Sequence, residues 1–177
     1  MKKWIYILGV LFGVVGIYRY SKKKGISLGK LTTKPPKVRL VYSRIVPESE
    51  RVKISSSSNV VRLFRKLWSS QIEIKEEFYV LLLDRANHVL GYHVLSQGGT
   101  SATVVDPKIL YALAVESLAS NIIIAHNHPS GSLKPSEQDI RLTSKVKAAG
   151  KSLDINLLDH IIITKEGHYS FADEMQL

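Results

Sequence analysis

The hydrophobic pattern changes several times along the chain and predicts strands that alternate with helices. Residues 78–84, FYVLLLD, form a near-continuous apolar run, which is typical of a strand buried on both faces. The turn DRAN separates this run from residues 88–96, HVLGYHVLS, and predicts a hairpin. Further strands are predicted in the segments KVRLVYSRIV, TSATVV, IIIA, LLDHIIIT and HYSF.

Three helices are predicted from apolar periodicity and capping residues. A serine run at residues 55–58 precedes VVRLFRKLW, and its last two members can cap a helix there. Asp106 and Pro107 are typical of an N-cap and a first helical turn, so PKILYALAVESLA is predicted to be helical. A third helix is predicted at residues 137–149, ended by Gly150. The alternation predicts an α/β fold, a mixed β-sheet flanked by helices.

The first 24 residues contain an uncharged apolar run, WIYILGVLFGVVGIY, at residues 4–18. As a helix it would be about 22 Å long, so flanking Lys, Arg and aromatic side chains would have to extend it across a hydrocarbon core of about 30 Å. A signal peptide and a buried core helix are the alternatives, but there is no small-x-small cleavage site and no polar face. The sequence therefore predicts an N-terminal apolar helix in a membrane-anchor segment, residues 1–24, with membrane association through residues 4–20. The basic cluster that follows predicts a cytoplasmic location for the rest of the chain.

Charge divides the chain into a basic N-terminal part and a mildly acidic remainder. Residues 1–75 carry 17 Lys/Arg and 3 Asp/Glu, whereas residues 76–177 carry 8 and 12. We therefore predict a basic linker at residues 25–52 and a folded domain at residues 53–177. The basic arm can attract anionic lipid or nucleic acid, but the charge balance of 76–177 does not support a nucleic-acid partner. The chain has no cysteine, which excludes disulfides and thiolate metal ligands.

The stretch HNHPSGSLKPSEQD, at residues 126–139, has the residue types of a metal site. His126 and His128 are two residues apart at the end of a predicted strand, so both imidazoles point to the same side. The Pro-Ser-Gly turn brings the chain back, and Asp139 lies in the first turn of the next helix. A His₂Asp set with one open position for water is the pattern of a catalytic zinc. Ser136-x-x-Asp139 is also a capping box, and the two interpretations are compatible.

A metal-activated water needs a proton acceptor, and two glutamates stand at the start of the buried strand. Glu76 and Glu77 point to opposite faces of that strand, and periodicity cannot choose between them. Among the remaining histidines, His160 follows Asp159 at the start of a predicted buried strand. A satisfied structural pair is favoured there over a pair that supports a metal ligand.

The pattern Glu…His-x-His-Pro-x6-Ser-x2-Asp resembles the JAMM (MPN+) metalloprotease signature. Together with EEFYVLLLDRAN, LLDHIIIT and YSFAD, it is similar to the bacterial RadC-like JAB-domain family over about residues 53–177. The resemblance implies a JAB/MPN fold related to cytidine deaminases, Zn²⁺ on His126, His128 and Asp139, Glu76 as general base, and Ser136 as a group that stabilises the oxyanion.

This resemblance also implies an activity, a zinc-dependent hydrolase that attacks a peptide or isopeptide bond in a peptide or protein substrate. The alternative it leaves open is a RadC-like DNA-repair or mobile-element-associated protein that acts on or near nucleic acid. A third interpretation is a scaffold that keeps the site without catalysis. Deaminase chemistry is disfavoured because the Pro-Cys-x-x-Cys zinc ligands of such enzymes are missing.

Overall fold

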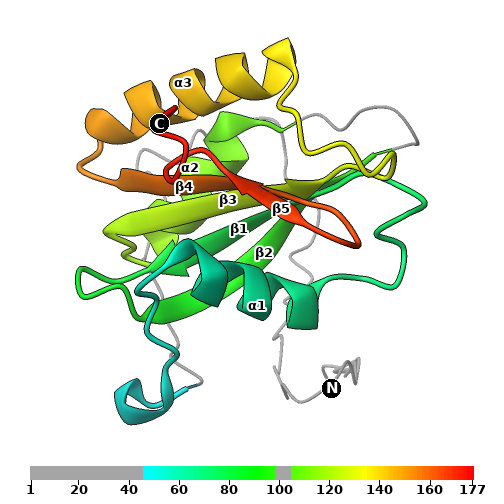
Figure 1. The fold of residues 1–177 in the computed structure, drawn as a ribbon. Helices are drawn as coiled ribbons and strands as arrows, with labels where there is room; N and C mark the ends of the chain where they lie inside the picture. The colour runs from blue at the N-terminus through cyan, green and yellow to red at the C-terminus, as the bar shows by residue number, and fades with distance from the viewer. Residues whose placement is uncertain (1–45, 99–104) are drawn as a thin grey trace, which may run out of the picture. The chain divides into compact units, whose positions relative to one another are not determined.

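Five strands form one mixed sheet in a computed structural model that describes residues 46–98 and 105–177 (Figure 1). The helices and strands, in chain order, are η1 (Glu48–Glu50), α1 (Ser57–Leu67), β1 (Glu77–Leu83), β2 (Val89–Gln97), α2 (Pro107–Glu116), β3 (Asn121–Asn127), α3 (Glu137–Lys151), β4 (Asn156–Ile163) and β5 (His168–Ser170). Neighbouring strands follow the order β2-β1-β3-β4-β5.

Strand directions explain why the sheet is mixed. β1 pairs antiparallel with both β2 and β3, and β5 pairs antiparallel with β4. β3 and β4 are parallel, and α3 provides the crossover that such a connection needs. The predicted mixed sheet flanked by helices is therefore confirmed. The predicted strand KVRLVYSRIV lies almost wholly outside the described residues, as does TSATVV except for its last residue.

The helices cover both faces of the sheet, α1 on one and α2 with α3 on the other (Figure 1). Along β1, Tyr79, Leu81 and Leu83 pack in the core beneath α1, while alternate residues pack beneath α2 and α3. Along β3, Ile122 and Ile124 face α2 and α3. His126 continues that alternation, so it points to the same face of the sheet.

Two helix ends differ from the sequence-based expectation. The N-cap of α1 is Ser56, whose side chain accepts from the Asn59 backbone, and not Ser57 or Ser58. Gly150 does not end α3, which runs on to a C-cap at Ser152. A Cβ at Gly150 would collide with the Ile155 carbonyl and approach the Tyr111 hydroxyl, so this glycine permits close packing inside the helix.

The membrane-anchored, cytoplasmic localisation predicted from the N-terminal part is contradicted. Within residues 46–98 and 105–177, no helix is long and apolar enough to cross a membrane. The longest of these helices, α3, has 15 residues and buries only one side, and a span needs about 20 apolar residues. The structure does not describe the predicted apolar helix in the membrane-anchor segment, residues 1–24. Of the predicted linker at residues 25–52, residues 25–45 also lie outside the described residues.

Candidate metal centre

The end of β3 and the start of α3 bring His126, His128 and Asp139 together. Their candidate ligand atoms all lie within 4.8 Å of one another. His126 Nε2 lies 2.9 Å from His128 Nε2 and 3.2 Å from Asp139 Oδ1. His128 Nε2 lies 3.7 Å from Asp139 Oδ2. The two-residue spacing on a strand and the return turn thus place these groups where the sequence predicted.

These separations fit a small tetrahedral metal ion. Two ligand atoms at roughly 2.0–2.1 Å from a tetrahedral ion are about 3.3 Å apart. The two histidine nitrogens are 2.9 Å apart, and the two Asp139 oxygens lie 3.2 Å from His126 Nε2 and 3.7 Å from His128 Nε2, so these distances lie around that value. Two imidazoles and a carboxylate also match zinc in ligand type. The residues could therefore hold a divalent ion.

The position of the hydrogen on His128 leaves one nitrogen of this ring free to accept. His128 Nδ1 lies 2.7 Å from the Ser132 carbonyl oxygen, which can only accept, so Nδ1 carries the hydrogen. The lone pair of the neutral ring is then on Nε2, which faces His126 and the Asp139 carboxylate. The lone pair of His128 and the Asp139 carboxylate thus face the same small space, which favours a cation there, either a proton or a metal.

Electrostatics around Asp139 agree with this arrangement. Burial raises the pKa of Asp139, but hydrogen bonds and charge from His126 and His128 outweigh it and bring the pKa well below its usual range. The hydrogen bond that a protonated His128 makes to Asp139 raises the pKa of His128 in turn. The carboxylate is therefore ionised at neutral pH, as a metal ligand must be.

Ser136 fixes the orientation of Asp139 at the start of α3. The Ser136 backbone N–H and hydroxyl donate to Asp139 Oδ2 at 2.7 and 2.6 Å. Ser136 Oγ accepts from the Asp139 backbone, which completes the predicted capping box. In this structure the Ser136 hydroxyl therefore holds the carboxylate.

The register of β1 against β3 places Glu76 on the face of the cluster. Phe78 pairs with His126 and its ring stacks on the imidazole at 5.5 Å. Since side chains alternate, Glu76 shares that face, one step beyond Phe78 and toward His128. Burial raises the pKa of Glu76, and the nearby His126 and His128 lower it in part. Glu76 is thus within electrostatic reach of the cluster, with a pKa raised as a general base requires.

Glu77 points to the opposite face, and its carboxylate is engaged in hydrogen bonds and an ion pair within the fold. Its carboxylate is buried, accepts from Ser69 Oγ at 2.8 Å and from Gln97 Nε2 at 3.2 Å, and pairs with Lys75 at 3.1 Å. These partners belong to the layer beneath α1 or to the sheet edge, and not to the group formed by His126, His128 and Asp139. The structure thus gives the two glutamates different surroundings, a distinction that strand periodicity alone could not make.

Asn127, between the two histidines, holds the segment that presents Glu76. Its Nδ2 donates to the carbonyl oxygens of Ile72 and Lys75 at 2.7 and 2.9 Å, and its Oδ1 accepts from the Glu77 backbone at 2.7 Å. Asn127 is fully buried. Sequence reasoning missed this residue, although a buried polar residue between two metal-ligand candidates was a usable signal.

Asn127→Ala is expected to lower both stability and turnover. Its loss leaves buried backbone groups unpaired and should cost about 3 kcal/mol of unfolding free energy, measured by urea denaturation. The matched control is Asn121→Ala at the other end of β3, where the amide donates to Asp84 O and Asn87 Oδ1 and accepts from Asn156. The control should lose similar stability but keep turnover per folded molecule. Equal turnover in the two variants would show that Asn127 does not position Glu76.

His160 lies against the cluster and departs from the sequence-based preference. His160 Nε2 lies 2.9 Å from His126 Nδ1, so it supports a ligand candidate, the alternative that was disfavoured. Burial lowers the pKa of His160 well below its usual value, and the nearby His126 lowers it further. Asp159 is instead structural, because it accepts from Ser170 Oγ and the Ala172 backbone.

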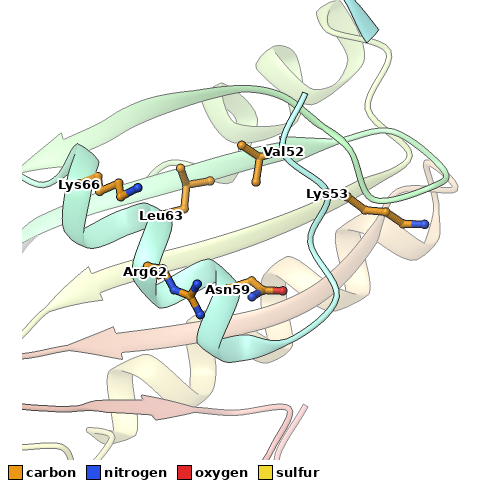
Figure 2. Close-up of a pocket in the computed structure, with 6 residues that line it drawn as sticks. All are labelled: Val52, Lys53, Asn59, Arg62, Leu63 and Lys66. Carbon is orange, nitrogen blue, oxygen red and sulfur yellow. The ribbon is translucent and has the colours of Figure 1, made fainter. Parts of the chain in front are cut away.

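A hollow of about 190 Å³ lies beside α1, on the side of the sheet opposite to the candidate metal centre (Figure 2). Its lining residues come from α1 and the segment before it: Val52, Lys53, Asn59, Arg62, Leu63 and Lys66. Three cations with no imidazole or carboxylate can attract an anion but cannot hold a metal ion. A nucleic-acid partner, which the sequence left as an alternative without support from the charge balance of residues 76–177, is not tested by this hollow.

Comparison with known proteins gives matches over most of the chain. A family model for the RadC-like JAB domain matches residues 54–177. A UPF0758 protein of Flavobacterium johnsoniae is 48% identical over 99 residues, which cover 56% of this chain and 43% of that protein. A UPF0758 protein of Porphyromonas gingivalis is 42% identical over 134 residues, 75% of this chain and 59% of that protein.

One relative extends the match nearly to the full chain. A UPF0758 protein of Coprothermobacter proteolyticus is 32% identical over 176 residues, which cover 95% of this chain and 75% of that protein. The chain spans about half the length of the first two relatives, 43% and 59%. The names of these relatives state no activity.

Proposed function

Because this chain belongs to the RadC-like JAB-domain family, we propose that it is a metal-dependent hydrolase of JAMM type, which cleaves a peptide or isopeptide bond. The observation that carries the proposal is the convergence of His126, His128 and Asp139, which together could hold a metal ion, with the lone pair of neutral His128 turned toward the other two. The JAB-domain family includes metallohydrolases, and the donor set is the one such an enzyme would use.

Zinc is the ion we propose for these three ligands, since two imidazoles and one carboxylate are typical of catalytic zinc. Bound there, zinc would acidify a water molecule and polarise the carbonyl of the bond to be cleaved. The chain's own groups then have three tasks: to hold the ion, to move a proton, and to stabilise negative charge on the substrate oxygen.

Glu76 is the group that we assign to proton transfer. It would take the proton from the attacking water and give it to the leaving amine, which a carboxylate with a raised pKa does well near neutral pH. Ser136 is assigned to the oxyanion. Because the Ser136 hydroxyl donates to Asp139 Oδ2 in this structure, it must turn from the carboxylate to reach a substrate oxygen.

Removal of the metal tests the proposal as a whole. Treatment with a chelator should abolish hydrolysis of an isopeptide-linked or peptide substrate panel, and zinc should restore it. A metal that binds only the folded state, at a free concentration of about 100 times its Kd, adds about 2.7 kcal/mol to the free energy of unfolding. The protein from which the chelator has removed the metal should therefore also melt at a lower temperature. Hydrolysis at an unchanged rate after complete removal of metal would contradict the proposal.

A further inference from the structure

A chain of hydrogen bonds runs from α3 to the candidate metal ligand His126. Thr143 Oγ1 lies 2.6 Å from the Asp139 carbonyl oxygen and 2.6 Å from His160 Nδ1. His160 Nε2 then lies 2.9 Å from His126 Nδ1. Thr143, His160 and His126 are all buried, with exposed fractions of 3%, 0% and 0%, so water does not compete for these bonds.

The donor and acceptor in each of these hydrogen bonds follow from the first acceptor, the Asp139 carbonyl oxygen. A carbonyl oxygen only accepts, so the Thr143 hydroxyl donates its single hydrogen to Asp139 O. The hydroxyl can then only accept from His160, which places a hydrogen on His160 Nδ1. A neutral His160 with hydrogen on Nδ1 has its lone pair on Nε2, and that lone pair accepts from His126 Nδ1–H.

We propose that Thr143 and His160 are positioning residues that fix His126 in the form a metal requires, with its hydrogen on Nδ1 and its lone pair on Nε2. The inference rests on the proposed function, because it concerns the partners of a proposed metal ligand. His128 reaches the same form by a simpler route, donation to the Ser132 carbonyl. The two ligands are thus oriented independently, one from the turn and one from α3.

Packing holds the hydrogen-bonded relay, which consists of Thr143, His160 and His126, in place. The His160 ring stacks on Phe171 with centroids 4.8 Å apart and planes 9° from parallel, and it lies 5.6 Å from Phe78. Thr143 lies one helical turn beyond Asp139, so one helix presents a metal ligand and the start of the relay. Any shift of α3 would therefore affect both histidine orientation and the carboxylate.

The test compares Thr143→Val, which keeps the shape but removes the hydroxyl, with Thr143→Ser, which keeps the hydroxyl. Zinc affinity, measured by competition with a chromophoric chelator, should fall about 10- to 100-fold in Thr143→Val, as expected for loss of an outer partner. Thr143→Ser should bind close to the wild type. Ser170→Ala is the control, because it removes another buried hydroxyl, bonded to Asp159, without touching the relay.

A second readout uses metal-free protein and reports the tautomer directly. NMR of ¹⁵N-labelled histidine should show His126 with hydrogen on Nδ1 in the wild type, and a mixture of forms in Thr143→Val. Wild-type affinity together with an unchanged His126 tautomer in Thr143→Val would overturn the inference. A wild-type chain that binds no zinc contradicts the proposed function instead, and the tautomer measurement still decides the relay.

If Thr143→Val does not fold, His160→Gln and His160→Leu decide the matter. The Gln carbonyl oxygen can accept from His126 Nδ1–H, whereas Leu offers no acceptor. His160→Gln should therefore bind zinc at least about tenfold more tightly than His160→Leu. Equal affinities in these two variants would overturn the role of His160.

Discussion

Replacement of Glu76 by Gln is expected to stop hydrolysis while the metal stays bound. Gln has nearly the same shape but cannot accept a proton from water or return it to a leaving amine. Loss of a general base typically lowers the rate by about 10²–10⁴-fold. The measurements are turnover on a peptide or isopeptide substrate and metal content of the same preparation. A metal-loaded Glu76→Gln protein is also the form with which to capture the unknown substrate.

Glu77→Gln is the matched control, one residue along the same strand. It weakens the buried contacts with Ser69 and Lys75, so the free energy of unfolding should fall by about 1–3 kcal/mol. Turnover per folded molecule should remain. If Glu77→Gln abolishes turnover in folded, metal-loaded protein and Glu76→Gln does not, the assignment of the base is wrong.

Asp139→Asn is expected to weaken metal binding strongly while the fold is kept. An Asn oxygen can still accept from the Ser136 hydroxyl and backbone, so the cap of α3 should survive. The negative charge that faces the two imidazoles is lost, however, and a neutral amide is a poor zinc ligand. Zinc affinity, measured by chelator competition, should fall by about 100-fold or more, beyond the effect typical of an outer partner.

Glu137→Gln is the control for charge alone, because Glu137 lies two residues earlier in the same helical turn. Its carboxylate is exposed and pairs with Arg141 at 3.2 Å. Zinc affinity and turnover should not change, since an exposed pair contributes about 0–1 kcal/mol. An equal loss of zinc affinity in Glu137→Gln and Asp139→Asn would mean that Asp139 is not a ligand.

Much of the fold followed from local pattern. The continuous apolar run at residues 78–84 predicted β1, and Asp106-Pro107 predicted the start of α2, because burial and capping are local properties. The spacing of His126, His128 and Asp139 was informative for the same reason, since strand alternation and a helix start fix their directions. The resemblance to the RadC-like JAB-domain family is confirmed by the family match.

The features of the site that could not be predicted from local sequence depend on contacts between distant segments. Periodicity alone could not choose between Glu76 and Glu77; the resemblance favoured Glu76, and only the pairing of Phe78 with His126 across two strands shows that Glu76 shares the face of the cluster. The role of His160 needed the parallel pairing of β3 with β4 and the position of Thr143 on α3. Neither register has a local signature.

Gly150 shows a different limit. A glycine near the end of a helical pattern normally predicts its end. Here α3 continues because the missing Cβ makes room for the Ile155 carbonyl. The error at Gly150 arose from a tertiary contact that overrides a local rule. The cap of α1 was predicted one or two residues too late, because neighbouring serines in the run 55–58 are equally able to cap a helix.

The most direct test of the central claim is the metal content of wild-type protein purified without chelators, beside His126→Ala prepared in the same way. We predict about one zinc per wild-type chain and almost none in the variant, with both proteins folded by circular dichroism. A folded wild-type chain that holds no metal and binds none on addition, or a variant that retains it, would contradict the assignment of His126, His128 and Asp139 as a metal centre.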